Sequence, residues 1–452
     1  MPPTDLEALR GAVRGPVEET AAARERAGRD GSHLNGRPRA VLAPRDVDDV
    51  VAAVAWARST GIPLVPRGGG TSLDGESVPA DGAVVVDLSG WRTIREVSAL
   101  ERWARVEPGV VNLDLQHALA PHRMFFPPNP GSWATSTIGG HVGTNASGPR
   151  SFRYGPTRAW VRALEVVLGT GERARLGSIA PKRSVGPELG ELLVGSEGTL
   201  GIVTEVTVRL APRPAVRWGA VVPVPPGARL GALAGRLAAA PGTGLSALEF
   251  VDAACARALV TGRGVDWPAD GPLVLLEIEA DDPADADARL GRVAAVLRAA
   301  GVPGIARRYD DADRLWSERG ASGIVLDEQY GERIREDVAV PLPAVDALAA
   351  AIDGIARAEG VPVYTFGHLG EGSLHPNFVV DPTSPPADRI RSALYDAALG
   401  LGGTISGEHG VGRVKRPFVA RELGPTGVRL LRAMKAACDP DGILNPGKLY
   451  PP

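Results

Sequence analysis

The spacing of hydrophobic residues in the first half of the chain alternates between that of helices and that of strands. From Asp46 to Thr60 apolar residues recur at helical spacing, after an aspartate suited to capping and before Gly61, which predicts a helix. The polar residues up to about Asp30 predict one helix or an irregular leader. Strands are predicted at 62–66, 83–88, 161–168, 173–176 and 202–210, and a glycine turn joins the third and fourth as a hairpin.

The pattern changes after Pro212-Arg213-Pro214, which predicts a domain boundary. Beyond it strands alternate with longer helical stretches, and glycines that stop helices stand at 301 and 360. This alternation favours an α+β sheet with helices on one face. Predicted helices span 227–240, 283–300, 343–359 and 426–437, and predicted strands span 245–251, 272–280 and 361–366.

Glycine-rich segments in the first half indicate a nucleotide-bearing ligand. Gly68-Gly69-Gly70 follow a predicted strand, and consecutive glycines can point several N–H groups into one nest that fits a pyrophosphate. The segment 130–148 is rich in small and hydroxyl-bearing residues, which leave room for a large planar ligand, and 195–203 is a third such segment. None of them is a GxGxxG motif that opens a Rossmann helix or a GxxxxGK[ST] P-loop, so NAD and ATP lose support.

Histidines near the C-terminus indicate a metal site with a base beside it. His368, His375 and the pair Glu408-His409 lie among glycines that allow tight turns, although the whole chain has only 7 histidines. Two imidazoles and a carboxylate suit a divalent metal ion. The remaining His409 is a natural proton acceptor near neutral pH. A metal ion and a base together favour chemistry on a hydroxyl group.

Composition narrows the class of protein. The chain has 452 residues, 44% of them hydrophobic, and this length predicts two or three lobes. Its net charge of -3 gives no basic excess that would favour a nucleic-acid partner. Its 2 cysteines, Cys255 and Cys438, are too few for a disulfide framework or an iron–sulfur cluster. No apolar run reaches the ~18–20 residues of a membrane span, and the first residues lack a signal-peptide pattern. A soluble cytoplasmic protein is therefore expected.

The glycine segments and the two histidine motifs together resemble the FAD-linked oxidases of the vanillyl-alcohol oxidase / p-cresol methylhydroxylase superfamily. The best fit is the branch of D-lactate dehydrogenase, the glycolate oxidase large subunit and D-2-hydroxyglutarate dehydrogenase. The resemblance runs from about Arg29 to Lys448. The segments that carry it are 66–72, 130–148, 195–203, 367–377, 406–415 and 439–448.

The resemblance implies an α+β fold with a PCMH-type FAD-binding domain of two subdomains, an α+β cap domain with an antiparallel sheet, and a C-terminal segment that returns to the FAD domain. The expected domains are 1–212, 213–405 and 406–452. The first glycine segment has no His or Cys, which favours non-covalent FAD, and His141 is the histidine to check for a covalent link. The implied FAD-binding residues are Arg67, Gly68, Gly69, Gly70, Thr71, Ser72, Pro130, Gly131, Thr137, Gly140, Gly148, Ile202, Val203, Asn445 and Lys448.

The resemblance also assigns roles in the second half. His368, His375 and Glu408 would hold zinc or a manganese-type ion, and His409 would be the catalytic proton acceptor. Arg319, in Trp-Ser-Glu-Arg, would hold the substrate carboxylate. Arg335 stands where the family usually has lysine, and as an arginine it would grip a carboxylate or phosphate bidentately.

One departure from the family pattern concerns the substrate. This chain has Glu371 and Ser373 where the family motif usually carries Asp and Asn, so substrate contacts at Ser373 differ from the pattern. The leading hypothesis is an FAD- and metal-dependent dehydrogenase that oxidises a D-2-hydroxy acid to the 2-keto acid by hydride transfer to flavin N5. A same-fold flavin oxidoreductase acting on a larger sugar or nucleoside-type metabolite, and a non-catalytic flavin- or metal-binding protein, are the alternatives.

The resemblance leaves the electron acceptor open. Without an iron–sulfur extension after Lys448, electrons would leave for a separate protein, a quinone or oxygen. The oligomeric state is open too, with a homodimer as one option.

Overall fold

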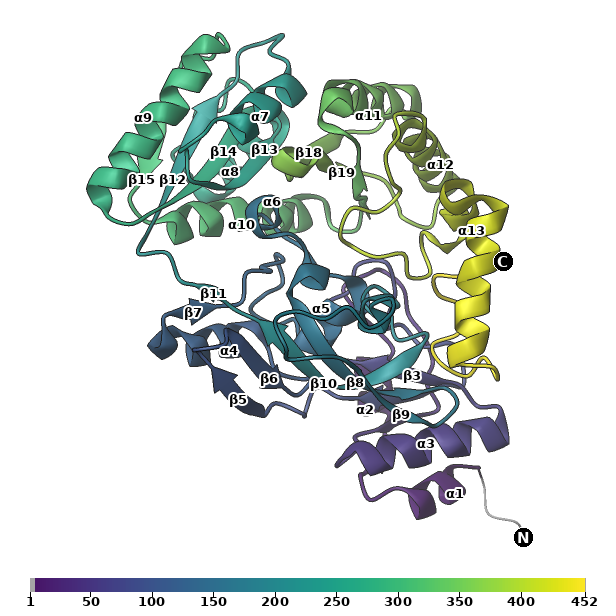
Figure 1. Ribbon diagram of the computed structural model, residues 1–452. Coiled ribbons are helices and arrows are strands. Elements are labelled where there is room, and N and C mark those ends of the chain that lie inside the picture. Colours follow the sequence, from purple (N-terminus) through teal and green to yellow (C-terminus); the bar gives the residue numbers. More distant parts are fainter. Residues whose placement is uncertain (1–4, 452) are drawn as a thin grey trace. The chain divides into compact units, whose positions relative to one another are not determined.

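Two units make up the chain in the computed structural model, which describes residues 5–451 (Figure 1). Residues 1–4 and 452, at the ends of the first and last expected domains, lie outside the described residues. Unit 1 comprises Met1–Ser147, Pro156–Arg213 and Glu408–Pro452. Unit 2 comprises Gly148–Gly155 and Pro214–Gly407.

A four-stranded sheet in the order β1-β2-β4-β3 forms the first subdomain of unit 1. Helix α3 (Val47–Thr60) packs against it, and its ends follow from the sequence. The side chain of Asp46 accepts hydrogen bonds from the N–H groups of Asp48 and Asp49, and Gly61 ends the helix in the left-handed region at a φ of 71°. The strands are β1 (Val17–Glu18), β2 (Ala40–Leu42), β3 (Leu64–Arg67) and β4 (Val84–Asp87).

A five-stranded antiparallel sheet in the order β5-β6-β10-β8-β9 forms the second subdomain. Helices α4 (Asn112–Leu119) and α5 (Ile138–Thr144) contribute to the apolar core beneath it. The predicted hairpin at 161–176 is confirmed as β8 paired with β9. The strands are β5 (Ile94–Ser98), β6 (Trp103–Val106), β8 (Val161–Leu168), β9 (Arg173–Gly177) and β10 (Gly201–Arg209).

The C-terminal segment of the chain returns to unit 1, as the resemblance implied. Helix α13 (Val419–Cys438) breaks at Gly424, so that its second part begins near the predicted residue 426. Beyond it the chain adds to the edge of the first sheet, because the Leu64 N–H donates to the carbonyl of Ile443 at 2.9 Å. The Asn445 N–H donates to the carbonyl of Leu64 at 2.8 Å.

The core of unit 2 is an eight-stranded sheet in which every strand pair is antiparallel, as the resemblance implied for a cap domain. Its order is β15-β12-β14-β13-β18-β19-β16, with β17 also on β19. The strands are β12 (Val216–Pro223), β13 (Leu245–Val251), β14 (Leu273–Ala280), β15 (Arg307–Tyr309), β16 (Ile334–Arg335), β17 (Val338–Ala339), β18 (Val363–Gly367) and β19 (Ser373–Phe378).

Helices cover both faces of this sheet, so the prediction of helices on one face was wrong. Leu273 and Leu275 pack with α8 (Ala253–Arg263) and α10 (Ala312–Tyr330) on one face. The intervening residues of β14, which point to the other face, are also buried along the whole strand. Helix α9 (Pro283–Ala299) lies along β14 and β12 (Figure 1). Also in unit 2 are α6 (Ser151–Tyr154), α7 (Leu230–Ala239), α11 (Val345–Glu359) and α12 (Pro385–Gly400).

The residues before Asp30 form two helices rather than one, α1 (Asp5–Ala12) and α2 (Ala21–Ala27), with β1 between them. The second begins at Thr20, whose side chain accepts a hydrogen bond from the Ala23 N–H. Within residues 5–451, none of the helices combines the length and the apolar character that a membrane crossing requires.

We predict that Asp49→Asn destabilises unit 1 by about 2 kcal/mol, the loss of a charge-assisted hydrogen bond. Asp49 is 2% exposed, and its carboxylate accepts from the N–H groups of Arg14, Gly15 and Arg45 at 2.8, 2.9 and 2.7 Å. Burial opposes the charge, but these hydrogen bonds prevail and lower the pKa of Asp49. The stabilisation is therefore present above the ordinary aspartate pKa and is lost as pH falls through the lowered pKa.

Chemical denaturation of the two proteins at pH 7 and in acid measures this difference, which should shrink in acid. Asp46→Asn is the control, since asparagine caps a helix as well as aspartate does. Equal stability of Asp49→Asn and the unchanged protein at pH 7 would contradict the prediction.

Candidate active site

The hairpin of β18 and β19 places His368 and His375 together in unit 2. His375 lies opposite Phe366 in the register of the two strands, and His368 follows β18 directly. A short helical turn and Gly372, at a φ of 71°, return the chain from one strand to the other. The two imidazole centroids are 4.9 Å apart with their planes at 84°. The structure thus brings together two of the three predicted metal ligands.

Glu249, on the neighbouring strand β13, binds His368 and Arg319 at once. Its Oε1 lies 2.6 Å from His368 Nδ1, and its Oε2 accepts from Arg319 Nη2 at 3.0 Å. The carboxylate is fully buried. Burial would raise its pKa, but the charge and hydrogen bond of His368 and the charge of Arg319 outweigh burial and lower the pKa of Glu249.

Arg319 projects from α10 onto the same face of the sheet. Its guanidinium carbon lies 4.3 Å from the centroid of the Phe366 ring, in a cation–π arrangement. Salt bridge and ring together fix the guanidinium beside His368. Arg319 therefore stands next to the candidate metal ligands, where an arginine that holds a substrate carboxylate is needed. That role stays a prediction.

Asp337 contacts two residues of β19, Ser373 and His375. The Ser373 hydroxyl donates to Asp337 Oδ1 at 3.0 Å, and His375 Nδ1 lies 3.4 Å from the same oxygen. Gly407 approaches closely, because a Cβ there would lie 2.7 Å from Asp337 Oδ1 and 2.9 Å from Ser373 Oγ. Ser373 thus lies at the predicted site, with its hydroxyl engaged by a carboxylate.

Arg335 pairs with Asp327 of α10, which also holds Arg333. Arg333 is 4% exposed and donates to Asn377 Oδ1 at 3.1 Å, so it fastens α10 to β19. The Arg335 side chain is 36% exposed. Its predicted grip on a substrate would have to share the guanidinium with Asp327, and it stays a prediction.

Glu277, on β14, is the centre of a second buried charge cluster in unit 2. Its carboxylate pairs with Arg217 at 2.5 Å and with Arg150 at 3.6 Å, and it accepts from the Ser246 hydroxyl at 2.7 Å. Burial would raise the pKa of Glu277, but the charges of Arg217 and Arg150 lower it to about 2. Glu277 therefore stays ionised, and the segment 148–155 is fastened to the sheet through Arg150.

The glycine segments of unit 1 converge. A Cβ on Gly68 would lie 2.2 Å from Thr137 Oγ1, one on Gly69 would lie 2.6 Å from the carbonyl oxygen of Thr135, and one on Gly198 would lie 2.4 Å from Pro66. Only residues without a side chain allow these approaches. The structure therefore brings the first segment against the second and the third, as a single ligand would require.

The first segment has the donors that a pyrophosphate needs. Within residues 5–451, the backbone N–H groups of residues 68–72 donate to no protein acceptor, and these residues are exposed or half-buried. The side chain of Arg67, by contrast, donates from Nη1 to the carbonyl of Arg29 at 2.6 Å. A row of backbone donors around Gly70, at a φ of 65°, fits an anionic group.

The other predicted FAD-binding residues lie at several kinds of position. Pro130 and Gly140 are half-buried and Gly131 is exposed, whereas Thr137 caps α5 and is buried. Ile202 belongs to the core beneath the first sheet, and Val203 packs against the core of the second. Gly148 begins the short stretch of unit 2 that interrupts unit 1. Their roles stay predictions.

His141 is a core histidine of unit 1. It is 1% exposed, and its Nε2 lies 2.9 Å from the Ser136 hydroxyl. Burial lowers its pKa to about 4, so it is neutral at physiological pH.

Asn445 and Lys448 tie the tail of the chain to the interior of unit 1. The Asn445 amide donates to the carbonyls of Glu76 and Glu197 at 2.8 and 2.7 Å, and Lys448 Nζ donates to the carbonyl of Val78 at 2.7 Å. Burial, followed by the charge of Arg413, lowers the pKa of Lys448 to about 8. Both side chains are 1% exposed, which favours a bracing role.

Glu76 and Glu197 form a buried acidic pair near the start of the C-terminal segment. Burial raises the pKa of Glu76 well above its ordinary value, and the charge of Glu197 adds to this. Burial also raises the pKa of Glu197, while hydrogen bonds from Val411 and Gly412 oppose the rise. Glu408 and His409 belong to the same unit 1, and the chain leaves unit 2 at the peptide bond between Gly407 and Glu408.

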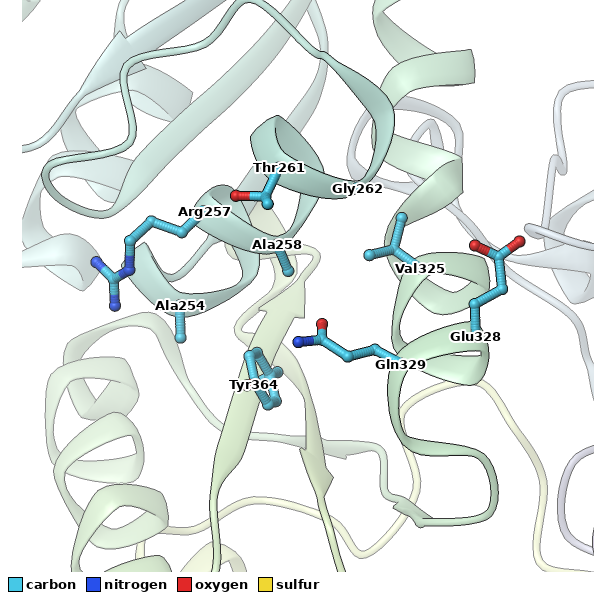
Figure 2. Close-up of a pocket in the computed structure, with 9 residues that line it drawn as sticks. All are labelled: Ala254, Arg257, Ala258, Thr261, Gly262, Val325, Glu328, Gln329 and Tyr364. Carbon is cyan, nitrogen blue, oxygen red and sulfur yellow. The ribbon is translucent and has the colours of Figure 1, made fainter.

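A separate cavity of about 430 Å³ lies in unit 2 between α8, α10 and β18 (Figure 2). Arg257, Glu328, Gln329 and Tyr364 are among its lining residues, and none of the predicted site residues takes part. The cavity borders β18 through Tyr364, but neither His368 nor His375 lines it.

Sequence reasoning missed the roles of Glu249, Asp337 and Glu197, which hold predicted residues in place. Glu249 lies 119 residues from His368 along the chain. The signal that was present is a glutamate inside an otherwise apolar strand, Leu245–Val251, because a buried charge needs a partner.

Family models match most of the chain. The "FAD binding domain" model matches residues 38–177, and the model of "FAD linked oxidases, C-terminal domain" matches residues 213–449. The glycine segments 68–72 and 130–148 fall in the first match, and both histidine motifs fall in the second.

Curated relatives are similar over nearly the full length. The chain is 35% identical to the glycolate oxidase subunit GlcD of Bacillus subtilis (strain 168), over 91% of this chain and 89% of that protein. It is 34% identical to the D-lactate dehydrogenase of Archaeoglobus fulgidus, over 90% of each. It is 33% identical to the D-2-hydroxyglutarate dehydrogenase of Stutzerimonas stutzeri (strain A1501), over 92% of each.

Solved structures share the fold. p-Cresol methylhydroxylase with bound substrate superposes with a TM-score of 0.82 at 17% identity, over 99% of this chain and 96% of that one. A 4-ethylphenol oxidase from Gulosibacter chungangensis superposes with a TM-score of 0.79 at 19% identity, over 99% and 97%. At these identities the likeness concerns the fold.

We predict that Glu277→Gln destabilises unit 2 by about 3–5 kcal/mol at pH 7, because it removes the one fully buried carboxylate that pairs with the half-buried guanidinium groups of Arg217 and Arg150. Since the folded-state pKa of Glu277 is lowered to about 2, its stabilisation is present above the ordinary glutamate pKa and is lost as pH falls through about 2. Chemical denaturation measures both effects.

The control is Asp313→Asn, which removes the other partner of Arg217, at 2.8 Å. That side chain is 64% exposed, so the expected loss is below about 1 kcal/mol. Equal losses from the two substitutions would count against the buried pair.

Proposed function

The chain belongs to the FAD-linked oxidases, and we propose that it uses FAD and a divalent metal ion to oxidise a small D-2-hydroxy acid to the 2-keto acid. The observation that carries this proposal is the bridge made by Glu249, which fixes a candidate metal ligand, His368, next to a candidate carboxylate-binding residue, Arg319. The printed names of the relatives, which refer to glycolate, D-lactate and D-2-hydroxyglutarate, share the 2-hydroxy acid group.

His368, His375 and Glu408 are the proposed metal ligands. The bond of His368 Nδ1 to Glu249 resembles the carboxylate–histidine pairs that orient metal ligands and points to Nε2 as the ligating atom. Glu408 follows Gly407, which lies against Asp337 and Ser373, so one peptide bond limits its distance from the hairpin. Nitrogen and oxygen donors of this kind suit zinc or manganese.

Arg319 would hold the substrate carboxylate. Because Glu249 occupies one edge of its guanidinium and Phe366 one face, the arginine is held in place before the substrate arrives. Such preorganisation brings the hydroxyl-bearing carbon into a fixed position, which supplies part of the rate. A bound divalent ion would supply Lewis acidity that lowers the pKa of the substrate hydroxyl.

His409 would take the hydroxyl proton on an imidazole nitrogen. Bound FAD would supply the acceptor for the hydride from the substrate carbon. In unit 1 the donors of residues 68–72 would bind its pyrophosphate, and the segments around Thr137 and Gly198 would enclose the rest. The electrons would then pass to a separate acceptor.

We predict that His409→Ala leaves a folded, yellow protein whose flavin a D-2-hydroxy acid reduces at least about 100-fold more slowly, because general bases typically contribute that much. Anaerobic stopped-flow measurement of flavin bleaching tests this, with glycolate, D-lactate and D-2-hydroxyglutarate as substrates. His117→Ala is the control, since this histidine lies on α4.

Reduction of His409→Ala at the unchanged rate would refute the assignment of the base. If the unchanged protein binds flavin but no D-2-hydroxy acid bleaches it, the substrate class is wrong and a larger hydroxylated metabolite is favoured. Purified protein with neither flavin absorbance nor bound metal would favour a non-catalytic role.

We predict that Glu249→Gln weakens metal binding by about 10- to 100-fold, the usual effect of losing the partner of a metal-binding histidine. The KM for the hydroxy acid should rise as well, because Arg319 loses its charged anchor. Competition with a chelator, followed by elemental analysis, measures the affinity without requiring turnover.

Glu318→Gln is the matched control. Glu318 precedes Arg319 on α10, but its carboxylate accepts from Trp267 at 3.0 Å rather than from the histidine. Folded Glu249→Gln with unchanged metal affinity would contradict the role of Glu249.

A further inference from the structure

The segment after His409 lies against buried carboxylates of unit 1. Gly410 has a φ of 91°, and a Cβ there would lie 2.5 Å from Glu76 Oε1 and 3.1 Å from Glu197 Oε1. A Cβ on Gly412 would lie 2.1 Å from the carbonyl oxygen of Asp74. Gly410 therefore lets the backbone approach two buried carboxylates, and Gly412 lets it approach the backbone of Asp74, where a side chain would clash.

The carboxylate of Glu197 binds backbone N–H groups of the segment that follows His409. The N–H of Val411 donates to Glu197 Oε1 at 2.6 Å, and the N–H of Gly412 donates to Oε1 and Oε2 at 3.1 and 3.0 Å. The Glu197 side chain is buried, with the residue 5% exposed. Hydrogen bonds from N–H groups to a buried carboxylate are among the stronger ones in proteins. The backbone two and three residues after His409 is thus fixed to one side chain.

Glu197 is itself fixed on both sides. Its N–H donates to the carbonyl of Gly143 at 2.8 Å, and its carbonyl accepts from the Asn445 amide at 2.7 Å. Its φ of 54° lies in the left-handed region, which costs free energy for a residue other than glycine. Surroundings must hold such a residue in place, and the resulting conformation aims its carboxylate at Val411 and Gly412.

We propose that Glu197 is a positioning residue for the catalytic base: it holds the Glu408–Gly412 segment, and with it His409, against the glycine segment 195–203. The proposal rests on the proposed role of His409 as the base. It gives this glutamate of the third glycine segment a task beyond enclosing the cofactor. It also links the placement of the base to the same segment that the resemblance assigns to FAD.

The proposed role depends on the length of the side chain at position 197 and on its acceptor oxygen rather than on its charge. Glutamine at position 197 can still accept from both N–H groups through its single carbonyl oxygen, as Oε1 does now. Aspartate keeps the charge but is one methylene shorter, and alanine offers no acceptor. A series of glutamine, aspartate and alanine therefore separates geometry from charge.

The experiment compares Glu197→Gln, Glu197→Asp and Glu197→Ala as flavin-loaded proteins. Hydrogen exchange followed by mass spectrometry reports on the amides of the 408–416 segment, and anaerobic stopped-flow reports the rate of flavin reduction per bound flavin. We expect exchange on the order of 10- to 100-fold faster in the alanine and aspartate variants, because the hydrogen bonds to the carboxylate are lost. We expect flavin reduction to slow by on the order of 100-fold, the effect of a small displacement of a catalytic group.

Glu197→Gln should restore slow exchange and most of the rate, and substrate affinity should change little in all three variants. A purely structural role would instead lower flavin content and thermal stability while leaving the rate per bound flavin unchanged. Glu205→Gln is the matched control, because Glu205 lies on β10 and its carboxylate pairs with Arg95 at 3.3 Å.

Unchanged exchange in Glu197→Ala would overturn the proposal, and so would fast exchange with an unchanged rate of flavin reduction. An aspartate variant that behaves like the unchanged protein would also overturn it. If no hydroxy acid reduces the unchanged protein, the proposed function fails, and the exchange measurement still decides whether Glu197 holds the segment.

Discussion

The site in unit 2 depends on the pairing of the buried Glu249 carboxylate with His368 and Arg319. Removing a carboxylate from water costs several kcal/mol, and only close partners of opposite charge or strong donors offset that cost. Here the partners are His368 and Arg319, at 2.6 and 3.0 Å. The side chains that would bind metal and substrate are thus also the ones that make Glu249 tolerable. Each of the three residues is held by the others, so the site is formed by the fold of unit 2 itself.

The face of the unit 2 sheet that α8 and α10 cover has an apolar end and a charged end. Leu273 and Leu275 pack beneath α8 and α10, and farther along the same strand Glu277 and Glu279 take the equivalent alternate positions. Glu277 is satisfied by Arg217 and Arg150, and Glu279 by Arg153 at 3.3 Å. Because these arginines satisfy the two glutamates, a strand that mixes apolar and acidic residues can be buried along its whole length.

The sequence was sufficient where the determinants are local. Helix α3 begins after Asp46 and ends at Gly61 as predicted, and the predicted glycine turn joins β8 to β9. Both predictions succeeded because capping and turn conformations depend on a few adjacent residues. The glycines around His368 and His375 likewise indicated tight turns, and the two rings do lie together. Sequence was insufficient where a partner lies far along the chain, as Glu249 does from His368, since nothing local specifies which buried acid meets which base. The helices on both faces of the cap sheet were missed for the same reason: alternation along a strand does not say what covers its second face.

Each unit holds part of the proposed site through one buried carboxylate. Glu249 fixes His368, a proposed metal ligand, within unit 2, and Glu197 fixes the backbone beyond His409 within unit 1. The chain passes for the last time from unit 2 to unit 1 at the peptide bond from Gly407 to Glu408. Because each carboxylate acts inside its own unit, each set of residues can be ordered by local folding alone.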